Sequence, residues 1–192
     1  MSSVKMYTDG GWGCYNNGDR KGDGSYAFLF LDGNNKDKVI VIGEYLQNTT
    51  NNRTEMLAAI EGIKYLQDKS SDEHPTVNIV SDSGYLVKGY THPAYLDKWI
   101  ASGWRTSNNK PVSNQDLWEE LQRLSWHVGF TFTHIRGHNK DEDPQHAYWN
   151  DIVDKACSYL LQLRSLGFRL TLEYDLNTKE FTVIESKLVE RR

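Results

Sequence analysis

The stretch TTNNRTEMLAAIEGIKYL, residues 49–66, gives the clearest structural signal in the chain. Its apolar residues recur at the spacing of one helix face, at Met56, Ala59, Ile60, Ile63 and Leu66. The polar residues Thr50–Asn52 precede that face and are candidates for the helix cap. We therefore predict that a long helix begins here.

Short β-prone runs lie on both sides of this helix. Before it, three runs separated by turn signals predict an antiparallel meander, over Val4–Tyr7, Tyr26–Leu31 and Val39–Tyr45. After it, the predicted strands Val77–Val80 and Phe130–Ile135 alternate with amphipathic helices around residues 114–124 and 152–160. This order predicts an α/β layer fold with a mixed sheet.

The end of the chain is predicted to be an appendix to this fold. Arg169–Tyr174 and Phe181–Ile184 flank the polar stretch Asp175–Glu180, which predicts a small hairpin. No internal repeat or low-complexity linker separates it from the rest. We expect one domain over residues 1–166 and a C-terminal extension over residues 167–192 that packs on it.

The composition is that of an ordinary globular protein, with 38% hydrophobic and 25% charged residues. The formal net charge of −4 does not indicate a nucleic-acid partner. The two cysteines, Cys14 and Cys157, exclude a disulfide framework and a multi-thiolate zinc site. No signal-peptide core and no membrane-length apolar run is present. We expect a soluble, cytoplasmic monomer without a membrane contact or an obligate protein partner.

Four acidic residues stand where a functional site is expected. Asp9 and Asp82 end predicted strands, and ligand sites of α/β sheets gather beyond strand ends. Glu55 falls in the first turn of the long helix, and Asp154 lies on the last helix. Clustered carboxylates repel one another and need cations, and such hard oxygen ligands suit Mg²⁺ or Mn²⁺.

Each acid also has a purely structural interpretation. Asp82 followed by Ser83 is typical of a helix cap, and Glu55 favours a helix N-terminus electrostatically. Asp9 followed by Gly10 is typical of a turn. The spacing alone does not show that the four residues meet in space.

Five sequence blocks, in the same order, resemble ribonuclease H of type 1. They are YTDGG at 7–11, TTNNRTEMLAA at 49–59, SDSGYLVKG at 81–89, GWRT with KPV and NQDLW between 103 and 118, and RGH at 136–138 with NDIVDKA at 150–156. The resemblance covers roughly Val4 to Ala156. It implies an RNase H-like α/β fold, in which a five-stranded mixed sheet has helices on both faces.

The resemblance also implies an activity, namely hydrolysis of the RNA strand of RNA/DNA hybrids to 5′-phosphate and 3′-hydroxyl ends. It assigns Asp9, Glu55, Asp82 and Asp154 to catalysis and metal binding, with two Mg²⁺ ions bridged by Asp9 and Mn²⁺ as a substitute. His138 matches a loop histidine used in proton transfer or product release.

Matching positions also suggest contacts to the hybrid. Asn16, Asn17, Asn51 and Asn52 are expected at the minor groove, where the 2′-hydroxyl distinguishes RNA from DNA. Thr50 resembles a DNA-phosphate contact, and Trp104 resembles a residue near the DNA strand. The structural alternatives are helix capping for Asn51 and core packing for Trp104.

Some features depart from the family pattern. The stretch Asn139–Trp149 is longer than the usual loop, Gly84 replaces a polar side chain, and the middle region is poorly basic. Three other interpretations stay open: another nuclease of the same fold, a non-catalytic hybrid-binding module, and the nuclease domain of a reverse transcriptase. The block at 49–59 argues against the first, and the presence of all four carboxylates argues against the second.

Overall fold

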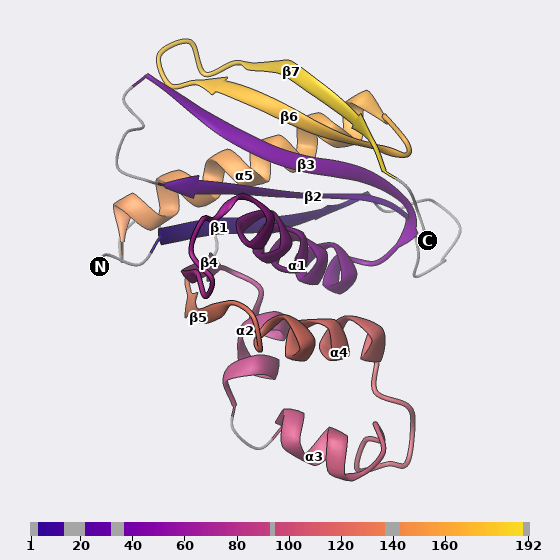
Figure 1. Cartoon of the computed structure of the whole chain (residues 1–192). Coiled ribbons are helices and arrows are strands. Elements are labelled where there is room, and N and C mark those ends of the chain that lie inside the picture. Colours follow the sequence, from indigo (N-terminus) through magenta and orange to yellow (C-terminus); the bar gives the residue numbers. More distant parts are fainter. Residues whose placement is uncertain (1–3, 14–21, 32–36, 93–94, 137–142, 190–192) are drawn as a thin grey trace.

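The computed structural model describes residues 4–13, 22–31, 37–92, 95–136 and 143–189 (Figure 1). The strands are β1 Val4–Trp12, β2 Gly22–Leu31, β3 Lys38–Thr49, β4 Thr76–Ser81, β5 Gly129–His134, β6 Phe168–Asp175 and β7 Phe181–Leu188. The helices are α1 Asn51–Lys69, α2 Gly84–Thr91, α3 Tyr95–Ala101, α4 Gln115–Leu124 and α5 Pro144–Leu163. Among the described residues, no helix is long and apolar enough to cross a membrane.

One mixed sheet forms the centre of the molecule, with strand order β5-β4-β1-β2-β3-β6-β7. The first three strands pair in antiparallel fashion, which confirms the predicted meander. β4 pairs parallel to β1, and β5 pairs parallel to β4. The sheet therefore brings the end of β4 beside the middle of β1, and the end of β5 lies next to the end of β4.

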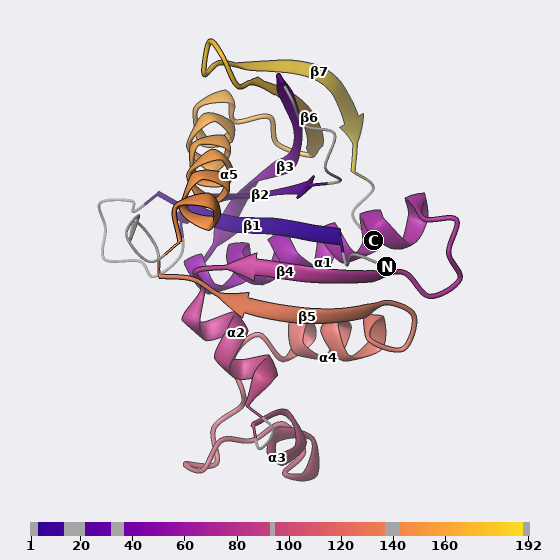
Figure 2. The same cartoon turned by 90° about the vertical axis from the view of Figure 1, so that its left-hand side faces the viewer.

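Helices cover both faces of the sheet, as expected (Figures 1 and 2). On one face, α1, α2 and α4 enclose a core that contains Met6, Phe28 and Trp118. On the other face, α5 lies alone over the sheet and encloses a core that contains Tyr7, Leu29 and Cys157. Met6 and Tyr7 are adjacent in sequence and serve opposite cores, because successive side chains of a strand point to opposite faces.

Over the described residues the sheet has seven strands, so the expected count of five is wrong. The predicted hairpin does form, but β6 pairs with β3 and extends the sheet. Leu170, Leu172 and Tyr174 on β6 are buried beneath α5. On the opposite face, Arg169 contacts Glu61 on α1 and donates to the Tyr26 hydroxyl at 3.2 Å.

The first strand also differs from its predicted length. β1 continues to Trp12, so Asp9 lies within the strand and does not end it. The glycines at 10 and 11 suggested a turn, but they pair with Tyr26 and Ser25 of β2. A neighbouring strand thus overrides the local preference of glycine for turns.

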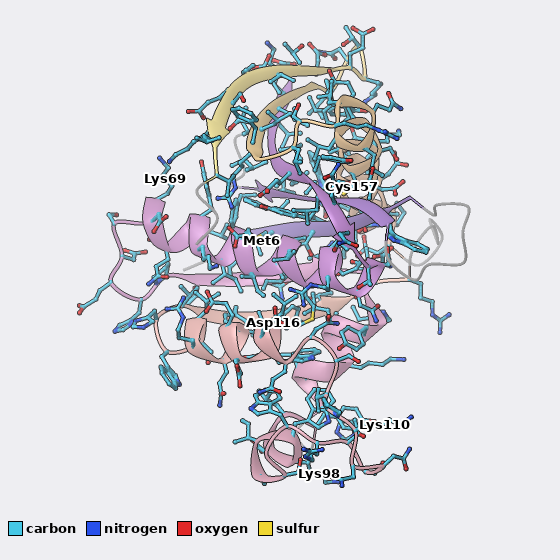
Figure 3. The ribbon with its side chains drawn as sticks, turned by 90° about the vertical axis from the view of Figure 1, so that its right-hand side faces the viewer. Met6, Lys69, Lys98, Lys110, Asp116 and Cys157 are labelled. Atoms are coloured by element: carbon cyan, nitrogen blue, oxygen red, sulfur yellow. The ribbon has the colours of Figure 1, made fainter. Side chains whose placement is uncertain are left out.

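The helices α2, α3 and α4 build a lobe below the sheet, and α3 lies farthest from it (Figures 1 and 2). The lobe is held by aromatic packing of Trp99 on α3 against Trp118 on α4, with ring centroids 5.5 Å apart. Lys98 and Lys110 lie at the far end of this lobe (Figure 3).

Candidate active site

Three carboxylates converge at the middle of the sheet. Asp9 on β1, Glu55 on α1 and Asp82 directly after β4 each offer an oxygen atom, and these atoms lie within 4.8 Å of one another. Asp9 and Glu55 are each 6% exposed, whereas Asp82 is half-buried. Asp9 and Glu55 are therefore buried in the protein, and Asp82 lies nearer to solvent.

Two glycines allow the flanking helices to approach Asp9. Gly10 packs against the backbone of Thr54 and Glu55 on α1, where a side chain has no room. Gly11 packs against α5, and a Cβ atom there would lie 2.9 Å from the Cβ atom of Cys157. In the sequence Asp9-Gly10-Gly11, the aspartate thus provides a carboxylate that can bind a metal ion. The two glycines leave the space that α1 and α5 need to pack closely beside it.

The turn after β4 fixes the position of Asp82. The Ser83 hydroxyl caps α2 by accepting a hydrogen bond from the backbone N–H of Leu86 at 3.3 Å. The backbone N–H of Ser83 donates to the Ser81 hydroxyl at 3.2 Å. Ser83, and not Asp82, is therefore the helix cap, so the carboxylate of Asp82 is not needed for capping.

Asp154 joins the cluster from α5. Its carboxyl group is near enough to Asp9 to hydrogen-bond with it and to raise its pKa. One turn further along α5, the Cys157 thiol donates to the backbone carbonyl of Asp9 at 3.4 Å. The helix α5 thus holds Asp154 beside β1, and all four predicted carboxylates meet at one place.

The electrostatics of this cluster favour a bound cation. Burial, followed by the negative charges of Asp82 and Asp154, raises the pKa of Asp9 well above its ordinary value. Burial and the charges of Asp9 and Asp82 raise the pKa of Glu55 in the same way. The Oε2 atom of Glu55 is buried and has no hydrogen-bond partner among the described residues. A divalent cation would satisfy this oxygen and relieve the repulsion, so the residues present fit a metal.

A hollow of about 460 Å³ adjoins the first turn of α1. It is lined by Trp12, Thr50, Asn51, Asn52, Ser113 and Asn114. Asn51 links it to the carboxylates, because its Nδ2 donates to Oε1 of Glu55 at 3.4 Å. Three of the predicted substrate-binding residues, Thr50, Asn51 and Asn52, are therefore brought together beside the cluster.

Sequence reasoning missed three residues of this hollow, Trp12, Ser113 and Asn114. Asn114 has a left-handed backbone conformation. Its side-chain oxygen accepts a hydrogen bond from the Arg53 guanidinium at 3.4 Å, and its side-chain nitrogen donates to the Tyr85 hydroxyl at 3.3 Å. Arg53 is itself fixed by a bidentate ion pair with Asp116. In the sequence, Asn114 opens the block NQDLW that resembles the family, but nothing in that block marked Asn114 as a contact residue.

Other predicted site residues lie elsewhere or need correction. Glu55 is in the second turn of α1, because the helix begins at Asn51 and has no acid in its first turn. Thr50 occupies the cap position, so the capping alternative for Asn51 is wrong. Trp104 is half-buried and packs against the core beneath α1, as its structural alternative expected. Asn16, Asn17 and His138 lie outside the described residues.

A sequence model of the RNase H family matches residues 1–160 of this chain. The chain belongs to the RNase H family. Two curated relatives named ribonuclease H agree with this. One, from Acetivibrio thermocellus, is 37% identical over 158 residues, which cover 82% of this chain and 94% of the relative. Another, from Cupriavidus pinatubonensis, is 40% identical over 139 residues, which cover 72% and 86% of the two chains.

Solved structures show the same fold. LC9-RNase H1, described as a type 1 RNase H with the type 2 active-site motif, has a TM-score of 0.62 at 23% identity, covering 82% of this chain and 72% of that one. The RNase H domain of prototype foamy virus has a TM-score of 0.66 at 17% identity, with coverage of 84% and 95%. The family match ends at residue 160, so β6 and β7 lie beyond it.

Proposed function

We propose that this chain is an endoribonuclease that hydrolyses the RNA strand of RNA/DNA hybrids, leaving 5′-phosphate and 3′-hydroxyl ends. The observation that carries this proposal is the cluster of Asp9, Glu55 and Asp82, whose oxygen atoms lie within 4.8 Å of one another. Asp154 completes the set from α5. Family membership and the names of the relatives support the choice of reaction.

The donor set consists of carboxylate oxygens, which suits two Mg²⁺ ions, with Mn²⁺ as a substitute. When bound, such ions supply a water nucleophile and stabilise charge on the attacking and leaving oxygens of an in-line displacement. Asp9, Glu55, Asp82 and Asp154 would hold them. The raised pKa values of Asp9 and Glu55 favour their protonated forms in the metal-free protein. These carboxyl groups must lose their protons to bind a metal ion, so metal binding releases protons.

The protein contributes a fixed arrangement of these oxygens. The Gly10 backbone N–H donates to Oδ1 of Asp9 at 2.8 Å and orients that carboxylate. Asn51 orients Glu55 in the same way. Four parts of the packed fold, β1, α1, the end of β4 and α5, would supply the ligands. Little reorganisation is therefore needed when charge develops on the phosphate.

Substrate contacts belong to the same proposal. The hollow beside the cluster presents the amides of Asn51, Asn52 and Asn114, which suit the hydroxyl groups and base edges of a minor groove. Thr50 would contact a DNA phosphate, and Asn16 and Asn17 the groove. We assign proton transfer or product release to His138, and a place near the DNA strand to Trp104.

The experiment compares end-labelled RNA/DNA hybrid, single-stranded RNA and double-stranded DNA, each with Mg²⁺ and with a chelator. We expect Mg²⁺-dependent cutting of the RNA strand of the hybrid alone, and loss of cutting in Asp82→Asn. Mapping the termini tests the proposed 5′-phosphate and 3′-hydroxyl ends.

Two outcomes would replace this proposal. Binding of the hybrid without cutting would indicate a hybrid-binding module. Cutting of double-stranded DNA, or removal of nucleotides one at a time from an end, would indicate another nuclease of the same fold.

A further inference from the structure

A histidine outside the carboxylate set lies directly beside it. His134 is the last residue of β5 and pairs in register with Ser81, the residue before Asp82. Its Nε2 atom lies 3.3 Å from the backbone carbonyl oxygen of Asp82. The imidazole is exposed. His134 is therefore an exposed side chain next to the backbone of one member of the cluster.

The carbonyl contact fixes which nitrogen of the ring carries hydrogen. A carbonyl oxygen accepts hydrogen bonds and cannot donate them, so Nε2 of His134 must be the donor to Asp82. In the neutral ring, the other nitrogen, Nδ1, then carries a lone pair and accepts. The contact thus orients the ring, and it leaves Nδ1 as the acceptor atom.

The neighbouring residue keeps this ring accessible. Gly84 begins α2 two residues after Asp82, and a Cβ atom built on it would have Nε2 of His134 as its nearest neighbour, at 3.8 Å. A longer side chain at position 84 would lie over the imidazole. The absence of one leaves the ring open to a ligand.

We propose that His134 reads the RNA strand by accepting a hydrogen bond at Nδ1 from a ribose 2′-hydroxyl beside the scissile phosphate. This inference rests on the proposed function. Phosphate oxygens only accept, so they do not suit a neutral Nδ1, and the DNA sugar has no hydroxyl to donate at this place. The 2′-hydroxyl is a donor that RNA alone provides. His134 is thereby a specificity residue in addition to the amides of the hollow.

The test scans the RNA strand of a hybrid, replacing one ribonucleotide at a time by its 2′-deoxy or 2′-O-methyl form, both of which lack the donor. In the wild type we expect one position next to the cut where either change lowers kcat/KM about threefold to tenfold, the size of one hydrogen bond. In His134→Phe this penalty disappears, and the unmodified hybrid is cut more slowly by the same factor. His127→Phe, which alters an exposed histidine in the α4–β5 connection, should leave the penalty unchanged.

Two further variants separate recognition from a structural role. Asn at position 134 places an amide near Nδ1, and Gln places one near Nε2. If the ring reads the hydroxyl, His134→Asn keeps much of the penalty and His134→Gln loses it. If the ring only supports the Asp82 carbonyl, His134→Gln behaves like the wild type, which would overturn the proposal.

Other outcomes also decide the matter. A penalty that is equal in the wild type and in His134→Phe would refute the contact. A penalty that follows guanine, and vanishes on replacing guanine by inosine, would point to a base amino group instead. Binding of the same hybrids is measured in parallel, so a chain that binds without cutting still tests the contact. Failure of the wild type to bind or cut any hybrid would instead refute the proposed function.

Discussion

A Cβ atom on Gly10 would lie 2.4 Å from the backbone nitrogen of Glu55. This close approach of β1 and α1 places Asp9 and Glu55 in one cluster, although the two residues are 46 positions apart in the sequence. The geometry of the proposed metal site therefore depends on a residue with no functional group of its own.

Gly10→Ala should accordingly weaken the fold and the site together. The added methyl group meets backbone atoms of Thr54 and Glu55, which cannot rotate away, so we expect about 1–3 kcal/mol lower free energy of unfolding. Denaturant unfolding and titration of the chain with Mg²⁺ measure the two effects. Gly13→Ala is the matched control, because its nearest contact would be 3.7 Å away. Equal stability of Gly10→Ala and the wild type would contradict the close approach.

Glu55→Gln should abolish cutting and yet stabilise the metal-free protein. The pKa of Glu55 is raised in the folded state, whereas the unfolded value is about 4.3. Above pH 4.3 the folded state therefore binds the extra proton, and its stability falls as the pH rises through the folded pKa, by at most about 1.4 kcal/mol per pH unit. Glu55→Gln has no carboxyl group at this position and does not lose stability in this way. Its free energy of unfolding should therefore equal that of the wild type near pH 4 and exceed it clearly near pH 8.

Urea unfolding with a chelator at several pH values measures this difference. Added Mg²⁺ should stabilise the wild type more than the variant, because the ion replaces the protons of the cluster. An advantage that does not change between pH 4 and pH 8 would show that repulsion among the carboxylates is not the cause.

Leu172→Ala should destabilise the whole domain, because β6 is part of the central sheet. Leu172 is fully buried under α5, and removing such a side chain costs about 2–5 kcal/mol. Val183→Ala on β7, where the side chain is 40% exposed, is the control and should cost much less. We propose from this packing that residues 167–192 are a structural part of the domain, so a chain ending at residue 166 should lose its cooperative unfolding. A truncated chain that unfolds like the full chain would show a dispensable appendage.

Lys98→Ala and Lys110→Ala test the lobe below the sheet as a hybrid-binding surface. Both residues lie at its far end (Figure 3). If each lysine contacts a phosphate, each substitution should reduce the slope of log affinity against log salt by about 0.9. Lys69, at the opposite end of α1 from the carboxylates, provides the control variant Lys69→Ala. An unchanged slope in both lobe variants would exclude the lobe from the electrostatic contacts.

The sequence by itself indicated most of the secondary-structure elements and the candidate metal ligands. Apolar residues recur about every 2 residues along a half-buried strand and about every 3.6 residues along a helix, because each element buries one face. These two spacings identified the meander and α1. Asp9, Glu55, Asp82 and Asp154 were selected from their positions and from the resemblance of their sequence blocks to a family. The structure brings these four side chains together beside β1, and their role as metal ligands stays a prediction.

Only the tertiary structure decided which contacts these elements make. Gly10 and Gly11 favour a turn locally, but pairing with β2 keeps them in a strand and lets α1 and α5 close on Asp9. The hairpin was visible in the sequence, but its pairing with β3 was not, because an apolar edge does not specify its partner. Asn114 began a predicted helix and a block that resembles the family, His134 lay near the end of a predicted strand, and neither was expected at the site. Their positions beside the carboxylates arise from long-range packing, which is the kind of contact that no local pattern encodes.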